Sequence, residues 1–286
     1  MSSNLSPQSP MRPLSVGNVV SSALVLYRSH LKLYLGLALK ALLWWFVPVY
    51  GWAKASMISA QISRLAFSEL VNQPETSKNV ESQLNPRMWS FLGARILVNL
   101  ILFGVNIGIS ILSAFVVFIP ALLITSVFRD SSASGLLSSL LQLVVQLASL
   151  AGQLWFQARF LITDLPIAIE NNVDATTTIS RSWELTKGSG VRIQLILLLA
   201  YLITMPLVII AFIPAVVLLI PFFASSPSQD AIVSFVSLVI FLVIVLAVLA
   251  GIFIMPFWQS IKAVIYYDLR SRREGLGLQL GDGREY

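Results

Sequence analysis

The chain has no cysteine and a single histidine, His30, in 286 residues. Without cysteine there is no disulfide, no thiolate nucleophile, no iron–sulfur cluster and no zinc site built on thiolates. A single imidazole also excludes every catalytic or metal site that needs two histidines. These absences remove many of the enzyme classes that residue spacing can reveal.

Charged residues are scarce as well. They make up 11% of the chain and hydrophobic residues 57%, against about 25% and 45–50% in soluble domains. The mean hydropathy is +0.83. Such a chain has too few charges to cover a water-exposed surface, and it is too hydrophobic to be disordered. The composition therefore predicts an all-α, polytopic helical membrane bundle.

The net charge is +6, but the basic residues lie at the ends of apolar runs and are not interleaved with aromatic residues. That arrangement reports membrane orientation rather than nucleic-acid binding. The sequence contains no nucleophile elbow, phosphate-binding loop, zincin helix or aspartate-rich diphosphate motif, and its apolar runs contain no acidic residue. We therefore expect a protein that is not an enzyme, with no cofactor and no catalytic or metal site.

Apolar runs and helical periodicity divide the chain into three regions. We expect a disordered tail at 1–13, a single helical membrane domain at 14–268 and a cytoplasmic tail at 269–286. Within the domain we expect about six membrane passes, the first two forming a short hairpin around Pro48. The passes are expected near residues 31–47, 49–67, 96–120, 136–158, 193–222 and 231–261.

Two amphipathic helices are expected to lie on the membrane surface, at 14–30 and at 175–187. Asp174 is placed to cap the second of these helices, and Gly188 is placed to end it. The polar stretch at 70–88 is expected to be a loop, and Pro120 is expected to end or kink the third pass.

Orientation follows from the distribution of lysine and arginine. With six passes and the N-terminus inside, Lys40 and Lys54 lie within the first two passes, and Arg129 alone of the 19 basic residues falls outside. A single crossing over residues 31–67 would move further basic residues outside, so the positive-inside rule favours six passes over five. We expect a cell-membrane protein with both termini in the cytoplasm.

Two passes carry a stripe of polar side chains at helical spacing. Amides at membrane depth need partners, so the stripes are expected to face each other or a common interior. We favour interhelical hydrogen bonding because no charge accompanies the amides; the open alternative is a path for a polar solute or a lipid headgroup. The stripes are Asn99, Asn106, Ser110 and Ser113 in one pass, and Gln142, Gln146, Ser149, Gln153 and Gln157 in the other.

Five basic residues are candidate contacts for lipid headgroups. Lys40 and Lys54 have no acidic residue in any pass to pair with, so they either reach the nearer headgroup layer or bind a lipid phosphate. Arg270, Arg272 and Arg273 follow the last pass and suit anionic lipid. Membrane lipids are the expected partners, with another membrane protein or a second copy of the chain as alternatives.

Residues 158–199 read ARFLITDLPIAIENNVDATTTISRSWELTKGSGVRIQLILLL. This stretch resembles the membrane domain found with glycerophosphoryl diester phosphodiesterases and in related bacterial proteins of unsettled function. The segments at 12–39 and 265–278 are similar to the ends of that domain. The pattern Ser-Trp-x-Leu-Thr-x-Gly is matched by Ser182, Trp183, Leu185, Thr186 and Gly188.

The resemblance implies a helical fold in a bacterial membrane. It does not imply phosphodiesterase activity, which belongs to a separate catalytic domain that uses a pair of histidines. The patterns together predict a non-catalytic integral membrane protein with a structural role or a role in binding a partner or lipid. The alternative is a transporter or lipid-handling protein that uses the polar seam, which would require a continuous polar cavity along Asn106 and Gln146.

Overall fold

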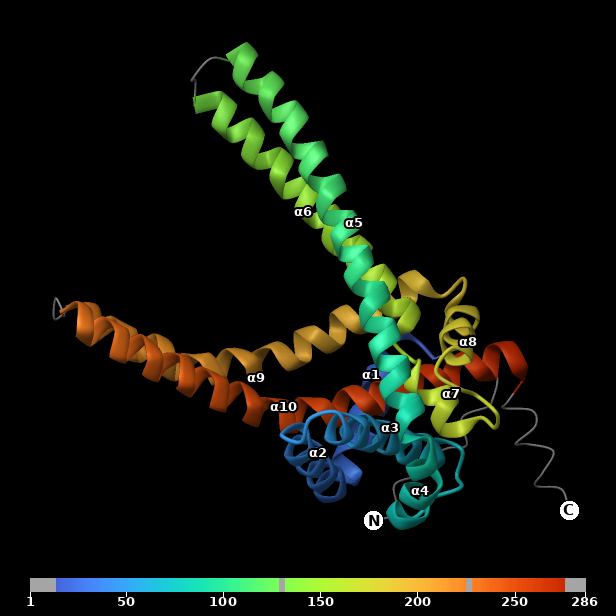
Figure 1. Cartoon of the computed structure of the whole chain (residues 1–286). Helices are drawn as coiled ribbons and strands as arrows, with labels where there is room; N and C mark the ends of the chain where they lie inside the picture. The colour runs from blue at the N-terminus through green and yellow to red at the C-terminus, as the bar shows by residue number, and fades with distance from the viewer. Residues whose placement is uncertain (1–13, 129–131, 225–227, 276–286) are drawn as a thin grey trace, which may run out of the picture.

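The computed structural model describes residues 14–128, 132–224 and 228–275 (Figure 1). These ranges contain α-helices, one short 3₁₀ helix and no strand, which confirms the predicted all-α fold. The predicted tail at 1–13 and the part of the C-terminal tail beyond residue 275 lie outside them. The elements are α1 (Val16–Ser29), α2 (Leu31–Trp45), α3 (Tyr50–Leu70), α4 (Ser77–Leu84), η1 (Asn85–Arg87), α5 (Met88–Phe128), α6 (Ser132–Phe160), α7 (Asp164–Ile169), α8 (Thr177–Thr186), α9 (Gly190–Ala224) and α10 (Gln229–Glu274).

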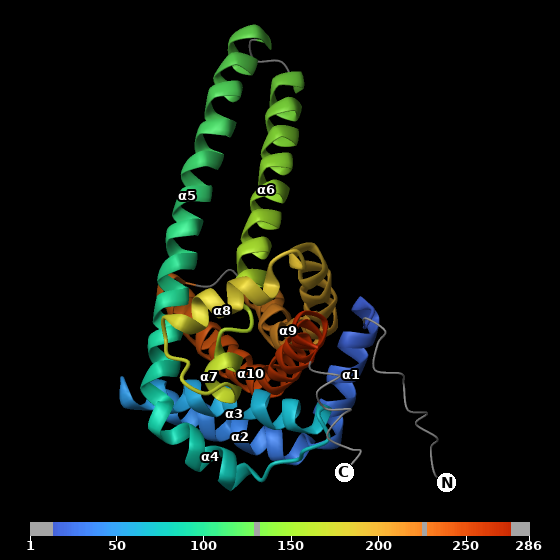
Figure 2. The ribbon, with the colours of Figure 1, turned by 90° about the vertical axis from the view of Figure 1, so that its right-hand side faces the viewer.

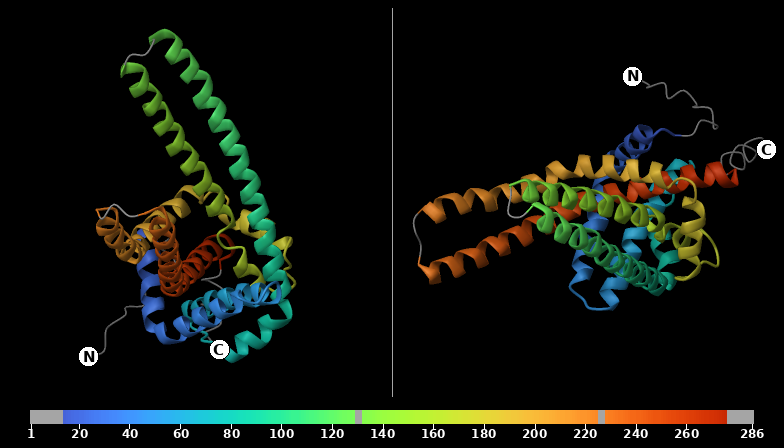
Figure 3. Two further views of the ribbon diagram at one scale, coloured as in Figure 1. Left: turned by 60° about the vertical axis from the view of Figure 1, so that its left-hand side comes forward. Right: turned by 90° about the horizontal axis from the view of Figure 1, so that it is seen from above.

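Two long helical hairpins project from a common base (Figure 1). One hairpin is α5 with α6 and the other is α9 with α10, and they leave the base in different directions (Figure 3). The base contains α1 to α4, α7 and α8, together with the adjoining ends of the long helices (Figure 2). Both α1 and the C-terminal end of α10 lie in the base, so the first and last helices are on the same side of the hairpins.

Four helices are long and apolar enough to cross a membrane: α5, α6, α9 and α10. They contain 41, 29, 35 and 46 residues. These lengths correspond to about 40–70 Å of helix, more than the roughly 30 Å hydrocarbon core of a bilayer. The described residues therefore support a membrane location with four crossings by length and composition, fewer than the six expected.

The short hairpin expected around Pro48 is present as α2 and α3, but it is part of the base. α2 has only 15 residues, about 22 Å of helix, which is shorter than the hydrocarbon core. α3 packs against α2, α5 and α10, and Met57 and Ile58 on it are both 0% exposed. Burial in protein and burial in lipid require similar side chains, and this is why composition alone did not separate the two.

The base encloses the hydrophobic core, to which α1, α3, α7 and α10 contribute. The apolar face predicted for α1 is correct, since Val19, Val20 and Ala23 are 0%, 3% and 0% exposed. That face packs against α9 and α10 rather than lying on the membrane surface. The second amphipathic helix is present as α8, whose Leu185 also joins the core.

Three further expectations are corrected by the structure. The polar stretch 70–88 is not a plain loop, because it contains α4 and η1. Pro120 lies inside α5, which continues to Phe128; proline is tolerated within apolar membrane helices, where neighbouring groups satisfy the freed backbone. The last helix extends to Glu274, so the first residues of the predicted C-terminal tail are helical, and it ends at Gly275 in the left-handed conformation.

Candidate functional site

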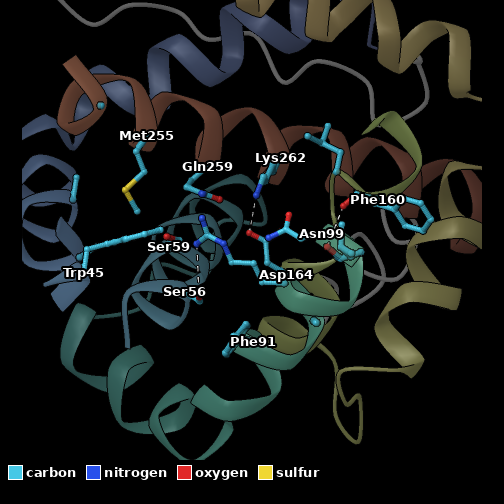
Figure 4. A pocket seen from close by; sticks show the side chains of 18 of the residues that line it. Trp45, Ser56, Ser59, Phe91, Asn99, Phe160, Asp164, Met255, Gln259 and Lys262 are labelled. Atoms are coloured by element: carbon cyan, nitrogen blue, oxygen red, sulfur yellow. Dashed lines mark hydrogen bonds and ion pairs between the residues drawn. The ribbon is translucent and has the colours of Figure 1, made fainter. Parts of the chain in front are cut away.

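A cavity of about 560 Å³ lies where the two hairpins meet the base (Figure 4). It is bounded by α2 and α3, by the first turns of α5, by the end of α6 and by α10. A volume of this size suits a small ligand or one end of a larger one. The walls are mostly apolar and include Trp45, Phe91, Val98, Leu102, Ile252 and Met255.

Charged side chains from three helices line one part of this cavity. Lys262 Nζ on α10 lies 3.0 Å from Asp164 Oδ2 on α7 (Figure 4). Arg95 on α5 places Nη1 3.5 Å from Ser56 Oγ on α3. The guanidinium carbon of Arg95 lies 5.6 Å from the centre of the Trp45 ring. The cavity therefore combines two cations, one carboxylate and an aromatic face.

Each of these charged residues stands at the end of an apolar run. Arg95 lies about two turns into α5 and directly precedes a stretch that is uncharged to Phe128. Asp164 begins α7 after α6 has ended at Phe160. Lys262 follows the apolar part of α10. Because charges are costly inside hydrocarbon, the sequence places all three at the boundary between the hairpins and the base.

The electrostatic balance of the cavity is positive. Arg95 forms no ion pair within the described ranges, whereas Lys262 and Asp164 neutralise each other. Asp164 Oδ1 is buried and, among the described residues, has no hydrogen-bond partner. An unpaired guanidinium beside an unpaired carboxylate oxygen suits a ligand whose anionic group is accompanied by a hydroxyl or other donor.

The polar stripes of α5 and α6 come together at one point. The hydroxyl oxygens of Ser113 and Ser149 lie 2.8 Å apart across the hairpin. Elsewhere the stripes do not face each other: Asn106 and Gln146 are both exposed, and Asn106 Nδ2 donates to the carbonyl of Leu102 in its own helix. The seam between the two helices is instead formed by smaller or apolar residues, among them Val105, Ile109, Val145 and Gly152.

The remaining members of the stripes lie in two places. Asn99 and Gln157 line the cavity. Ser110 and Gln142 are exposed on the hairpin, and Gln153 is half-buried. The structure thus brings the base ends of both stripes to the cavity and leaves the rest on the hairpin surface.

Lys40 and Lys54 both have polar partners within the base. Lys40 Nζ donates to Glu81 Oε1 at 2.8 Å, and Lys54 Nζ donates to Asn85 Oδ1 at 2.7 Å and lies 3.5 Å from the same Glu81 oxygen. Their partners come from α4 and η1, in the stretch that was expected to be a loop. The lysines therefore bind the base together.

The three arginines after the last pass differ from one another. Arg270 pairs with Glu274 at 2.7 Å, and Arg272 pairs with Asp268 at 3.0 Å. Arg273 donates to the backbone carbonyl of Lys187 and forms no ion pair among the described residues. Only Arg273 therefore retains the uncompensated charge that a headgroup contact needs.

The residues of the Ser-Trp-x-Leu-Thr-x-Gly pattern hold α8 against the end of α6. Ser182 Oγ donates to the carbonyl of Arg159 at 2.7 Å, and Thr186 Oγ1 donates to the carbonyl of Ser182 at 2.8 Å. Leu185 is 1% exposed and lies in the core. Gly188 has a φ of 77°, which fits its predicted place at the end of the helix.

Trp183 of this pattern packs its ring 5.7 Å from the rings of both Trp155 and Phe160, on α6. It is 36% exposed. The tryptophan therefore attaches α8 to α6, with one edge still open to the surroundings.

Sequence reasoning missed the cavity residues Arg95, Asp164 and Lys262. The sequence did contain a signal that could have identified them. Each of the three is the charged residue next to an apolar run, and all three lie on the same side of the expected bundle. Among the described residues no cluster of His, Asp and Glu could hold a metal ion. The groups present can bind an anion and orient hydrogen bonds.

Comparisons with family models, with curated proteins and with solved structures return no match.

Proposed function

We propose that this protein is a non-catalytic membrane protein that binds an anionic amphiphile, such as a phospholipid, in the cavity at the foot of its hairpins. The observation that carries the proposal is the unpaired guanidinium of Arg95 at the edge of an apolar cavity of about 560 Å³. A charged headgroup would meet Arg95, and the apolar part of the ligand would lie along the wall.

Asp164 supports a ligand with a donor next to its anionic group. Its Oδ1 is buried without a partner among the described residues, while Oδ2 is held by Lys262. An unsatisfied buried acceptor is costly, so a hydroxyl from the ligand would be favourable there. A headgroup with a phosphate and a neighbouring hydroxyl, as in phosphatidylglycerol, meets both requirements.

The cavity favours lipid binding over conduction. Its lining includes Asn99 and Gln157 but neither Asn106 nor Gln146. A transporter that used the polar seam would need the cavity to continue along those two amides. The exposed amides are instead the groups that another membrane protein or a second copy of the chain would cover.

The proposal includes a location. With α5, α6, α9 and α10 as crossings, the base lies on one side, and it carries all 16 basic residues that fall in the described ranges. The positive-inside rule then puts the base and both termini in the cytoplasm. We propose a bacterial cell membrane, because the chain resembles the membrane domain that accompanies glycerophosphoryl diester phosphodiesterases.

The test is binding of phosphatidylglycerol to the purified full chain in neutral detergent, with phosphatidylcholine as the uncharged comparison. Arg95→Gln should weaken phosphatidylglycerol binding about tenfold, since one charge-assisted contact is lost, and Arg95→Lys should restore part of it. Arg28→Gln is the matched control, because Arg28 is exposed on α1 away from the cavity lining.

Native mass spectrometry should show phosphatidylglycerol retained by the wild type and by Arg28→Gln, and lost from Arg95→Gln. If Arg95→Gln and Arg28→Gln bind phosphatidylglycerol with equal affinity, the proposal is contradicted. A wild-type chain that binds the two lipids equally well would also contradict it.

A further inference from the structure

Arg159, at the end of α6, is a buried cation with no counter-charge in the described part of the chain. The residue is 9% exposed. Its guanidinium carbon lies 4.7 Å from the centre of the Trp155 ring and 4.9 Å from that of Trp183. Its Nε and Nη1 are enclosed and make no hydrogen bond among the described residues. Buried charges are normally paired and hydrogen-bonded, so this guanidinium lacks a partner.

The surroundings of Arg159 add positive potential. Arg273 is close enough to act on it as a repulsive charge. Arg273 Nη2 donates to the carbonyl of Lys187, directly before the turn that starts α9. The first residue of that helix, Gly190, contacts the indole: a Cβ placed on it would lie 3.2 Å from Trp155 Nε1. Gly190 begins a 35-residue helix, whose free amides carry positive partial charge, and this helix start lies beside the Trp155 ring on which the guanidinium stacks.

Neighbouring carboxylates are already engaged elsewhere. Asp268 is paired with Arg192 at 2.6 Å and with Arg272 at 3.0 Å. Glu274 is paired with Arg181 and Arg270. Glu184, next to Trp183 on α8, is exposed and forms no ion pair in the described ranges. The cluster of Arg159, Arg273 and the α9 N-terminus is therefore electropositive and uncompensated.

We propose that this cluster binds a phosphate group, taken from a phospholipid headgroup or from free phosphate. The fork of Arg159 offers Nη2 together with Nε or Nη1 for a bidentate contact, Arg273 offers a second guanidinium, and the α9 amides complete the site. Neither Arg159, Arg273 nor the start of α9 is among the residues that line the cavity. It is therefore a second site, and it does not depend on the cavity.

The experiment follows the unfolding midpoint and tryptophan fluorescence of the full chain in neutral detergent. Inorganic phosphate is titrated against chloride at matched ionic strength, and dihexanoyl phosphatidic acid is titrated separately. In the wild type, one or both should raise the midpoint and change the fluorescence, since Trp155 and Trp183 cover the guanidinium. A response to both identifies free phosphate as a sufficient ligand, and a response to phosphatidic acid alone identifies a lipid headgroup.

Arg273→Gln is the main variant, because Arg273 is exposed and its loss leaves the packing of α6 against α8 intact. It should weaken the response about tenfold. Arg159→Lys keeps a charge but loses the bidentate fork, and it should weaken the response as well. Arg28→Gln controls for the loss of one positive charge and should leave the response unchanged, because Arg28 is exposed on α1.

A wild-type chain that responds to neither probe would overturn the proposal. It would also be overturned if Arg273→Gln responded as strongly as Arg28→Gln.

Discussion

Single polar residues in the base are held by partners that are distant in the sequence. Glu81 accepts a hydrogen bond from Lys40 on α2 and lies 3.5 Å from Lys54 Nζ on α3. Lys54 is only 7% exposed, so its charge is sheltered from water and depends on Glu81 and Asn85. One carboxylate on α4 thus ties two helices together, and this gives it more weight than an exposed surface pair.

Glu81→Gln should lower the free energy of unfolding by about 1–2 kcal/mol, because it removes the negative charge that compensates the buried Lys54. Chemical denaturation in detergent measures the loss. Glu184→Gln is the matched control, since Glu184 is exposed and forms no ion pair in the described ranges. If the two variants unfold at the same denaturant concentration, Glu81 has no such role.

At the scale of secondary structure, α8 shows how local signals fix a helix. Asp174 Oδ1 accepts hydrogen bonds from the backbone amides of Thr176 and Thr177 at 3.0 and 2.8 Å. These bonds satisfy donors that the first turn leaves free. Gly188 ends the element in the left-handed conformation. The end of the helix therefore agrees with the sequence signal, whereas its start lies two residues later than the expected residue 175 and Asp174 binds the turn before it.

The stability of this helix start should depend on pH at the acidic end. The hydrogen bonds from Thr177 and Thr176 hold the pKa of Asp174 below its ordinary 3.8, at about 2. A lowered pKa in the folded state means that the cap stabilises fully above about pH 4 and is lost as the pH falls towards 2. Hydrogen-exchange protection of the first amides of α8 should decline across that interval.

Asp174→Asn is the control for this effect, because an amide oxygen can accept the same hydrogen bonds but does not titrate. Its protection should be lower than that of the wild type at neutral pH and flat between pH 4 and 2. If the wild type is equally flat, the carboxylate does not act as the cap.

At the scale of the whole molecule, the two hairpins share one base. Both α5–α6 and α9–α10 leave the base and return to it (Figure 2). An even number of crossings keeps α1 to α4, α7, α8 and the end of α10 on the same side. Four crossings give the same sidedness as six would, since the α2–α3 hairpin returns to its starting side in both cases.

The topology can be tested by cysteine labelling, because the chain contains no native cysteine. Single cysteines at the exposed positions Asn79 and Ser180 should react with a membrane-impermeant maleimide only after the inner face is opened. Cysteines at Ala133 and Gln229, at the far ends of the hairpins, should react in intact cells. Labelling of Ser180→Cys and Gln229→Cys from the same face would disprove the arrangement.

A cysteine at Lys40 provides the separate test of four crossings against six. In the base it should react with the maleimide together with Asn79→Cys, because the side chain of Lys40 on α2 is partly exposed. Protection of Lys40→Cys in both intact and opened cells would indicate that α2 crosses the membrane.

The sequence by itself determined the helical class, the approximate positions of the long helices and the apolar character of the two hairpins. Each depends on local properties: the 3.6-residue period, the caps at Asp174 and Gly188, and uncharged runs longer than a bilayer needs. The side of the bundle on which each basic residue is expected also follows from the sequence, since it depends only on which apolar runs that residue flanks.

Only the tertiary structure decided what each apolar or polar face contacts. The α2–α3 hairpin was expected to cross the membrane, yet α3 is covered by other helices of the base. Lys54 meets Glu81, and Lys262 meets Asp164, across separations that no periodicity encodes. Asn106 and Gln146 have the spacing of a seam but lie outside it, because helix rotation is set by packing of Val105 and Gly152 in the seam. Which helix faces contact each other is a property of the folded arrangement. The cavity around Arg95 and the buried charge of Arg159 therefore appear only in the tertiary structure.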